Sequence, residues 1–216
     1  KAQAVTARGE ILAKVGLKHA ADPYLLCAEQ HCAVYRGLVG EVDSTTAAVE
    51  TTRGEALFDA TDRLVDSVYS AVCGGHTENN DVVWGGAPNA SLRGRPDVLA
   101  KSTRSVRPNS LHAFLDSKAD YACRVASFAQ PHKFRWEKRL SADEVDEKFA
   151  QLNLGRVMAM AVVERGVSGR ARLMSVSGET KATIVKGELN IRRTFGMLNS
   201  SMFEVSSQRD RKGMPL

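Results

Sequence analysis

Residues 157–186 read VMAMAVVERGVSGRARLMSVSGETKATIVK, and this stretch decides the fold class. It contains three short runs with the alternating pattern of half-buried β-strands, at residues 157–163, 172–176 and 182–185. The turns between and after these runs carry glycines, which supply the backbone conformations that tight turns need, at Gly166, Gly169, Gly178 and Gly187. The stretch therefore predicts a meander or small antiparallel sheet.

Helices are predicted upstream of this sheet. Residues 141–152 read SADEVDEKFAQL, where Ser141 can cap a helix and Glu144, three residues on, completes a capping box. Residues 1–16 place apolar side chains at helical spacing. Another helix is expected to begin with Ser44 as its cap and to run to Thr52, with Gly54 just past its end.

The segments between the helices show weaker patterns. We expect a loop at residues 18–29 and a short strand at residues 32–39. Residues 55–69 predict a β-hairpin with its turn at 59–62, and residues 73–88 predict a second irregular loop. Residues 98–140 are hard to assign. Together these elements predict an α+β fold with mixed, mostly antiparallel strands and a few helices around a cleft.

The chain of 216 residues predicts one domain over residues 1–216, with residues 98–150 as a sub-lobe. It opens at Lys1 inside a predicted helix and has no signal peptide, so we expect a domain truncated at both ends, with its targeting segment elsewhere. Both charge signs are mixed along the chain, so the net charge of +5 does not indicate a nucleic-acid partner. No apolar run is long enough for a membrane span.

A cluster of potential metal ligands lies near the start of the chain. Thiolate and imidazole are the ligands that zinc prefers, and His19, Cys27, His31 and Cys32 could close a structural site. Adjacent residues can face one ion only if the backbone there is not a regular strand. A disulfide, between Cys27 and Cys32 or from either to Cys73, and plain buried thiols are equally open alternatives.

A second cluster of polar residues is expected to line a substrate groove, at Tyr69, Ser70, Cys73, Gly74, Gly75, His76 and Thr77. Paired glycines let backbone amides approach a ligand closely. A Cys/His nucleophilic pair and an ordinary turn with a hydrogen-bonded histidine are the alternatives. Trp84 could stack on a sugar or cap the core, and Glu10 and Glu78 are among the carboxylates considered as a general acid.

These segments together resemble the SpoIID/LytB domain. The motifs that carry the resemblance are KAQAVTAR at residues 1–8, the C-x-x-x-HC-x-VY pattern at 27–35, TRGE at 52–55, the Y-x-S-x-CGGHTE pattern at 69–78 and VWG at 83–85. Residues 165–170 and 187–192 are similar to the family's C-terminal strands, so the resemblance covers nearly the whole chain. Ala33 replaces a family Gln, and Gly9 and Glu10 replace Thr-Tyr, which changes the packing of the first helix.

The resemblance implies a lytic transglycosylase of the extracytoplasmic cell envelope that cleaves peptidoglycan glycan strands, as in sporulation, with one glutamate as general acid and base. In the family this glutamate lies upstream of the KAQA segment, so we assign no catalytic residue within residues 1–216 and expect this stretch alone to be inactive. The family also implies zinc at His19, Cys27, His31 and Cys32. LytB-type members imply an alternative, a non-catalytic amidase enhancer that binds the wall and a cell-wall amidase; a purely structural envelope module is a third.

Overall fold

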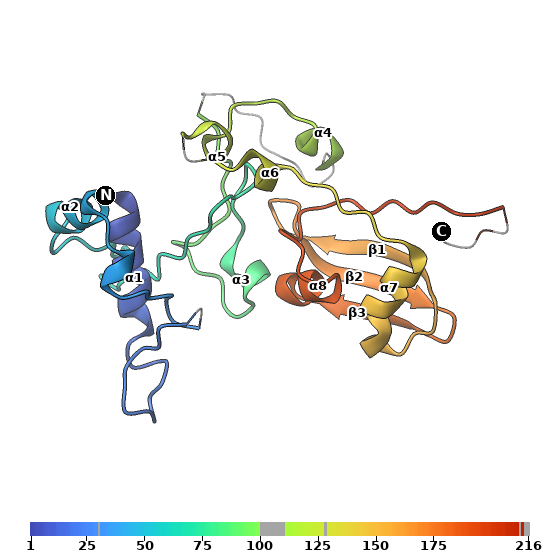
Figure 1. The fold of residues 1–216 in the computed structure, drawn as a ribbon, viewed down its shortest axis with the longest axis horizontal. Coiled ribbons are helices and arrows are strands. Elements are labelled where there is room, and N and C mark those ends of the chain that lie inside the picture. The colour runs from blue at the N-terminus through green and yellow to red at the C-terminus, as the bar shows by residue number, and fades with distance from the viewer. Residues whose placement is uncertain (30, 100–110, 128, 212, 214–216) are drawn as a thin grey trace. The chain divides into compact units, whose positions relative to one another are not determined.

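The computed structural model describes residues 1–29, 31–99, 111–127, 129–211 and 213. The chain divides into two compact units, Lys1–Ala71 and Val72–Leu216, and each is described by itself (Figure 1). Both helices and an antiparallel sheet are present, which confirms the α+β class. The prediction of one domain over residues 1–216 with a sub-lobe at 98–150, and that of a cleft, stay predictions.

The first unit is built on the helix α1 (Ala2–Lys14), which confirms the helix predicted at the start of the chain. Gly9 is the buried residue of α1, and a Cβ atom placed there would lie 2.8 Å from the carbonyl oxygen of Val65 and would also meet Ser67. Contacts this short would force a shift, so glycine lets α1 pack directly against residues 65–67.

The helix α2 (Asp43–Thr51) is also confirmed, but its predicted cap is wrong. The N-cap is Val42, and Ser44 lies inside the first turn. Thr45 instead donates its hydroxyl to the carbonyl of Val42 over 2.7 Å. Gly54, with φ of 79°, follows the helix as expected.

The strand predicted at residues 32–39 is wrong, because that segment forms a turn, an irregular stretch and the 3-10 helix η1 (Leu38–Gly40). Its strand-like residues Tyr35 and Val39 are 71% and 98% exposed. β-branched and aromatic residues favour a strand only where a neighbouring strand and a packed face exist. The predicted hairpin is reduced to a single antiparallel bridge between Phe58 and Leu64 around the expected turn.

The second unit contains the three-stranded antiparallel sheet, in the order β1-β2-β3, with β1 (Val157–Arg165), β2 (Ala171–Gly178) and β3 (Ala182–Lys186). The predicted meander is therefore confirmed. Ahead of it lies α7 (Ala142–Phe149), with Ser141 and Glu144 forming the expected capping box, followed by η3 (Ala150–Leu152). The shorter helices are α3 (Asn80–Val83), α4 (Leu111–Leu115), α5 (Ala122–Val125) and α6 (Pro131–Phe134).

Residues 187–192 were expected to belong to a C-terminal strand, and this is wrong, because they begin the helix α8 (Glu188–Thr194). Gly187 precedes it with φ of 90°, a conformation that ends β3. Glu188, Ile191 and Thr194 then recur at helical spacing and are buried. The irregular loop expected at 73–88 also differs, since it contains α3.

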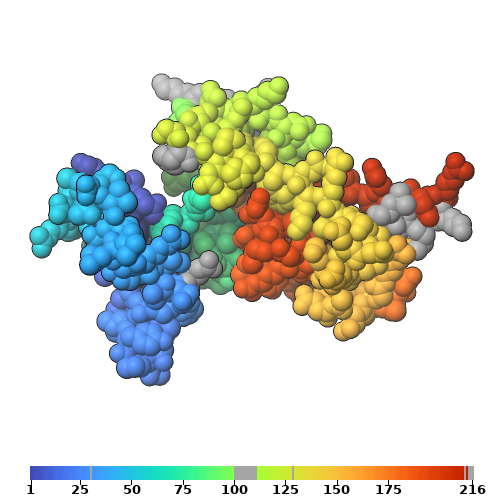
Figure 2. Space-filling model, viewed as in Figure 1, coloured from blue at the N-terminus to red at the C-terminus, as the bar shows by residue number. Residues whose placement is uncertain are grey.

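The main core joins α7 and α8 to the sheet. Phe149 of α7 and Ile191 of α8 are 1% and 0% exposed, and they share a core cluster with Met174 and Val176 of β2. Figure 2 shows the atoms of α7, in yellow, directly against those of the following strands, in orange. The sheet thus buries one apolar surface beneath helices, the usual solution for a sheet of this size.

A second core cluster is formed by residues in and next to the short helices and by Met202; its buried members are Leu111, Phe114, Tyr121, Phe134 and Met202. Arg135 lies within it, with its guanidinium carbon 4.1 Å from the centroid of the Phe134 ring. Its N–H groups donate to the carbonyl oxygens of Leu115, Phe114 and Gly74 over 2.7, 3.2 and 3.0 Å. In the part of the chain that the structure describes, no helix is long and apolar enough to cross a membrane.

Candidate metal centre

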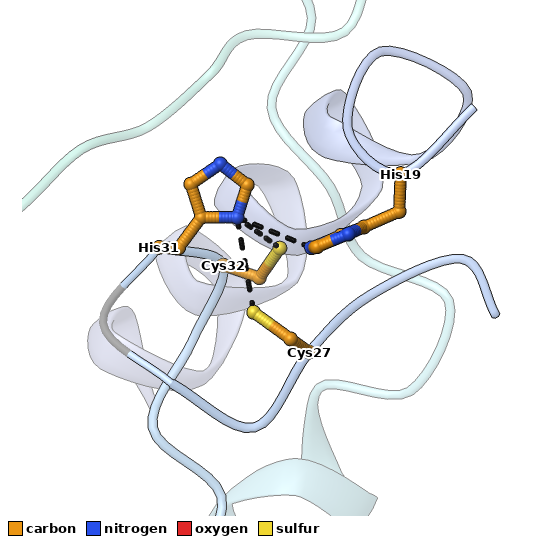
Figure 3. A group of neighbouring side chains, drawn as sticks. All are labelled: His19, Cys27, His31 and Cys32. Carbon is orange, nitrogen blue, oxygen red and sulfur yellow. Dashed lines mark hydrogen bonds between the residues drawn. The ribbon is translucent and has the colours of Figure 1, made fainter. Parts of the chain in front are cut away.

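The four residues predicted as metal ligands come together in the loop that follows α1. His19, Cys27, His31 and Cys32 each offer one ligand atom, and these atoms all lie within 4.8 Å of one another (Figure 3). A turn at residues 31–32, where the Cys32 N–H donates to the carbonyl of Glu29 over 3.1 Å, lets both adjacent side chains face the same point. The absence of a regular strand here is therefore what makes the site feasible.

The distances fit a tetrahedral zinc site. His31 Nδ1 lies 3.1 Å from His19 Nε2, 3.8 Å from Cys27 Sγ and 3.6 Å from Cys32 Sγ. Zinc bond lengths and tetrahedral angles require about 3.4 Å between two nitrogen ligands and about 3.6 Å between nitrogen and sulfur. The two sulfurs and two nitrogens thus form a donor set of the right chemistry and size.

Asp22 completes the surroundings of His19. Its carboxylate Oδ2 lies 2.7 Å from His19 Nδ1, whereas the other ring nitrogen, Nε2, is the one that lies near His31. This hydrogen bond raises the pKa of His19 and, in the neutral ring, holds the proton on Nδ1. Nε2 is then left with a free lone pair that faces the cluster, as in many zinc sites whose histidines are oriented by carboxylates.

The thiols differ in their surroundings. The backbone N–H of Glu29, followed by hydrogen bonds from His31 and His19, lowers the pKa of Cys27 to about 6. These hydrogen bonds favour the thiolate of Cys27, which is the form that binds metals. Cys32 is 2% exposed, so it closes the inner side of the cluster. All four cysteines of the chain are free thiols in the structure.

The loop is joined to α1 through Lys14. Its ammonium group donates to the carbonyl oxygen of Cys32 over 2.6 Å and forms an ion pair with Glu10 over 2.8 Å. Glu10, considered as a general acid, is thus engaged in positioning this lysine. The cluster and the first helix consequently form one hydrogen-bonded assembly.

The residues expected to line a groove fall into two sets. Tyr69 and Ser70 are exposed residues of the first unit, whereas Cys73, Gly74, Gly75, His76 and Thr77 belong to the second. Gly74 and Gly75 have φ of 71° and 98°, so glycine is needed at both positions. The groove itself stays a prediction, as does any nucleophilic role for Cys73.

His76 is buried, and its Nδ1 lies 2.6 Å from the carbonyl of Thr77. The loop is held against the turn between β1 and β2 by Arg170, which donates to the carbonyls of Cys73 and His76 over 2.9 Å each. Glu78 accepts hydrogen bonds from the hydroxyl and the N–H of Ser168, over 2.7 and 3.2 Å. The loop is therefore anchored, and Glu78 serves as one of its anchors.

Sequence reasoning missed three residues that the structure places at these clusters. Asp22 lies three residues after His19, and this spacing was a usable signal for a supporting carboxylate. Asp97 and Cys123 join Cys73 in a second group of potential ligands within 4.8 Å of one another. Cys123 is 50 residues from Cys73 in sequence, so no local pattern could link the two.

Comparison with known families assigns different parts of the chain to two models. Residues 78–215 match the domain of unknown function DUF8618, and residues 1–58 match SpoIID, described as stage II sporulation protein. No curated protein and no solved structure matches the chain. The SpoIID match contains all four residues of the Cys/His cluster, and it confirms the resemblance seen in the motifs at residues 1–8, 27–35 and 52–55. The chain belongs to the DUF8618 family, and its first 58 residues match the model of SpoIID, the stage II sporulation protein.

Proposed function

We propose that the protein acts on the glycan strands of peptidoglycan, in the extracytoplasmic cell envelope, as a lytic transglycosylase of the SpoIID type. One observation carries the proposal: the segment at residues 1–8 begins helix α1, and the other two segments that match SpoIID motifs are joined to this helix by hydrogen bonds. A chance similarity scattered over 58 residues would not be expected to converge on one local structure.

Arg8, the last residue of the KAQAVTAR segment, makes the first of these connections. Its guanidinium donates to the carbonyl oxygens of Thr52 and Glu55 over 2.8 and 2.5 Å, at both ends of the TRGE turn. Lys14, one and a half turns further along α1, reaches the carbonyl of Cys32 in the metal-ligand loop. The turn and the loop together fix the helix at two points.

This fixation suits the chemistry that the family implies. The catalytic glutamate of SpoIID domains stands just upstream of the KAQA segment, and a general acid must be held rigidly to act on one bond. Its carboxylic acid protonates the glycosidic oxygen as that bond breaks. The carboxylate then takes the proton from the sugar's own hydroxyl, which closes an anhydro ring on the same sugar, so no water is consumed.

Zinc enters this proposal as a structural ion. His19, Cys27, His31 and Cys32 would hold it, and it would supply a cross-link between residues on either side of an irregular loop. Because Lys14 connects that loop to α1, the order of the loop is expected to support the position of the helix. The reaction itself requires only the acid.

An exposed aromatic side chain supports glycan as the ligand. Trp84, at the end of α3, is 62% exposed, although tryptophan is highly buried in most proteins. An indole ring presents a flat apolar face with a polar N–H, which suits stacking on a sugar. Replacing Trp84 by Ala should weaken binding to isolated glycan strands, whereas Leu99→Ala, at a residue that is 63% exposed, should leave it unchanged.

A second candidate function needs none of the carboxylates that the sequence offers as a general acid. Glu10 is paired with Lys14, and Glu78 is bound by Ser168, so both carboxylates have structural partners. A wall-binding enhancer of a cell-wall amidase would need no acid of its own. It would stimulate the amidase on intact peptidoglycan and leave peptide-free glycan uncut.

The deciding experiment uses the full-length natural protein and glycan strands stripped of their stem peptides. Mass spectrometry should detect products that end in anhydro-muramic acid. The variant Arg8→Ala should reduce turnover by removing both hydrogen bonds to the TRGE turn, and Arg53→Ala, an exposed arginine of the same turn, should not. Uncut strands with wild-type protein, together with stimulated amidase activity, would replace the first function by the second.

A further inference from the structure

We propose that Cys73 and Cys123 form a disulfide bond that fastens together the backbone segments around the Gly74 and Gly75 loop. The inference concerns the second unit alone and does not depend on the activity proposed above. Neither the SpoIID match nor the Cys/His cluster includes these two residues.

The two sulfurs are already in contact. Cys73 Sγ lies 3.2 Å from Cys123 Sγ, and both side chains are half-buried. A disulfide has a sulfur–sulfur distance of about 2.05 Å, so an approach of roughly 1 Å is needed. Rotation about the side-chain bonds of the two cysteines is the movement that would shorten this distance.

The backbone holds the pair in place through Asp97. The Asp97 N–H donates to the carbonyl of Gly75 over 2.9 Å, and the Asp97 carbonyl accepts from the N–H of Ala122 over 3.0 Å. The Asp97 carboxylate accepts from the N–H of Cys123 over 2.8 Å. Residues on both sides of the contact are thus connected through one central segment.

Packing restricts the same region further. A Cβ atom at Gly75 would lie 2.9 Å from the ring of Tyr121, which is 4% exposed in the second core cluster. Gly75 and Tyr121 each lie two residues from one of the cysteines. The sulfur contact therefore belongs to a packed region with little room for the cysteines to separate.

Asp97 also accepts from the Cys73 thiol over 3.3 Å, so the three groups could be taken for a metal site. Two thiolates bound to one tetrahedral zinc stand about 3.8 Å apart, farther than these two sulfurs. The short distance between the two sulfurs therefore favours a covalent bond over a shared metal ion.

The oxidant is an external disulfide, carried by a thiol–disulfide oxidoreductase or by a small molecule such as oxidised glutathione. One cysteine thiolate attacks it, forming a mixed disulfide and releasing the first thiol. The other cysteine thiolate then attacks the protein sulfur of the mixed disulfide and releases the second thiol. Two electrons pass to the external disulfide, and the two protons lost by the cysteines end on the released thiols.

The test treats the full chain with a mixture of reduced and oxidised glutathione, blocks free thiols and digests with trypsin without reduction. Cleavage after lysine and arginine places Cys73 in the peptide 64–93, Cys123 in 119–124, and both Cys27 and Cys32 in 19–36. We expect peptides 64–93 and 119–124 to appear as a linked pair, lighter by two hydrogen atoms than their sum, that separates on reduction. Recovery of both peptides with blocked thiols would overturn the proposal.

A second measurement covers the case in which variants fold poorly. Reduction of the oxidised wild-type protein should lower Tm by roughly 10 °C, because the bond closes a long loop. The variant Cys123→Ser should lose this dependence on reduction, and Cys27→Ser should keep it. Zinc that remains bound to the Cys27→Ser variant and is lost on the further change Cys123→Ser would instead identify a metal site and refute the disulfide.

Discussion

Replacing Asp22 by Asn tests whether the Cys/His cluster is a built metal centre. The change keeps the size of the side chain but removes the charge that faces His19 Nδ1 over 2.7 Å. An asparagine can present its NH₂ group to Nδ1, which favours the proton on Nε2 and blocks the nitrogen that faces the cluster. Zinc affinity should therefore fall.

The magnitude follows from the surroundings of the pair. Loss of an outer partner of a metal-bound histidine lowers metal affinity by roughly 10–100-fold. The Asp22 side chain is 46% exposed, so water can replace part of its hydrogen bond, and we expect a loss near the lower end. Cys32→Ser removes a candidate ligand that is 2% exposed and should weaken binding far more than Asp22→Asn.

The assay is competition for zinc between the protein and a chromophoric chelator. Asp62→Asn is the matched control, since Asp62 is an exposed residue with φ of 55°, a conformation that asparagine tolerates. Equal affinity of the wild-type protein, Asp22→Asn and Cys32→Ser would refute the site. Equal affinity of the wild-type protein and Asp22→Asn alone would refute only the role of Asp22.

Three further predictions concern stability. Phe149→Ala should lower the free energy of unfolding by about 3–5 kcal/mol in urea titrations, since a 1%-exposed ring is lost, and Val163→Ala, at a 56%-exposed residue, should have little effect. Ser141→Ala removes the cap of α7 and should cost about 1 kcal/mol; an unchanged urea midpoint would contradict the capping box. Hydrogen bonds from the Thr61 hydroxyl and backbone lower the pKa of Asp59 from 3.8 to about 2. The ionised Asp59 carboxylate thus stabilises the folded protein above about pH 4, and this stabilisation is lost as the pH falls through about 2. The Tm difference between wild type and Asp59→Asn should therefore shrink over that range.

The fold was predictable where the signal is local. The alternation in residues 157–186 depends on which side chains face the core, and the Ser141 capping box depends on contacts three residues apart. The strand predicted at residues 32–39 does not form. Its β-branched and aromatic residues favour a strand, but the part of the chain that the structure describes places no neighbouring strand beside them. The helix α8 was missed because the resemblance assigned residues 187–192 to strands, although Gly187 marks the break.

The candidate site divides in the same way. His19, Cys27, His31 and Cys32 lie within one short stretch, so their chemistry and spacing were enough to group them. The contact of Cys73 with Cys123 depends on backbone pairing through Asp97, which no pattern of nearby residues reveals. Long-range pairs of this kind require the folded chain.

The hydrogen bonds of Arg135 limit how far the second unit can be shortened at its N-terminal end. Its guanidinium is surrounded by aromatic rings and carbonyls, and one of those carbonyls belongs to Gly74, 61 residues earlier in the chain. The DUF8618 match begins at residue 78, so a protein shortened to that match would leave a half-buried cation without one of its acceptors. Expression of this unit by itself should therefore start at Val72, where the compact unit begins, and a start at residue 78 should give a less stable product.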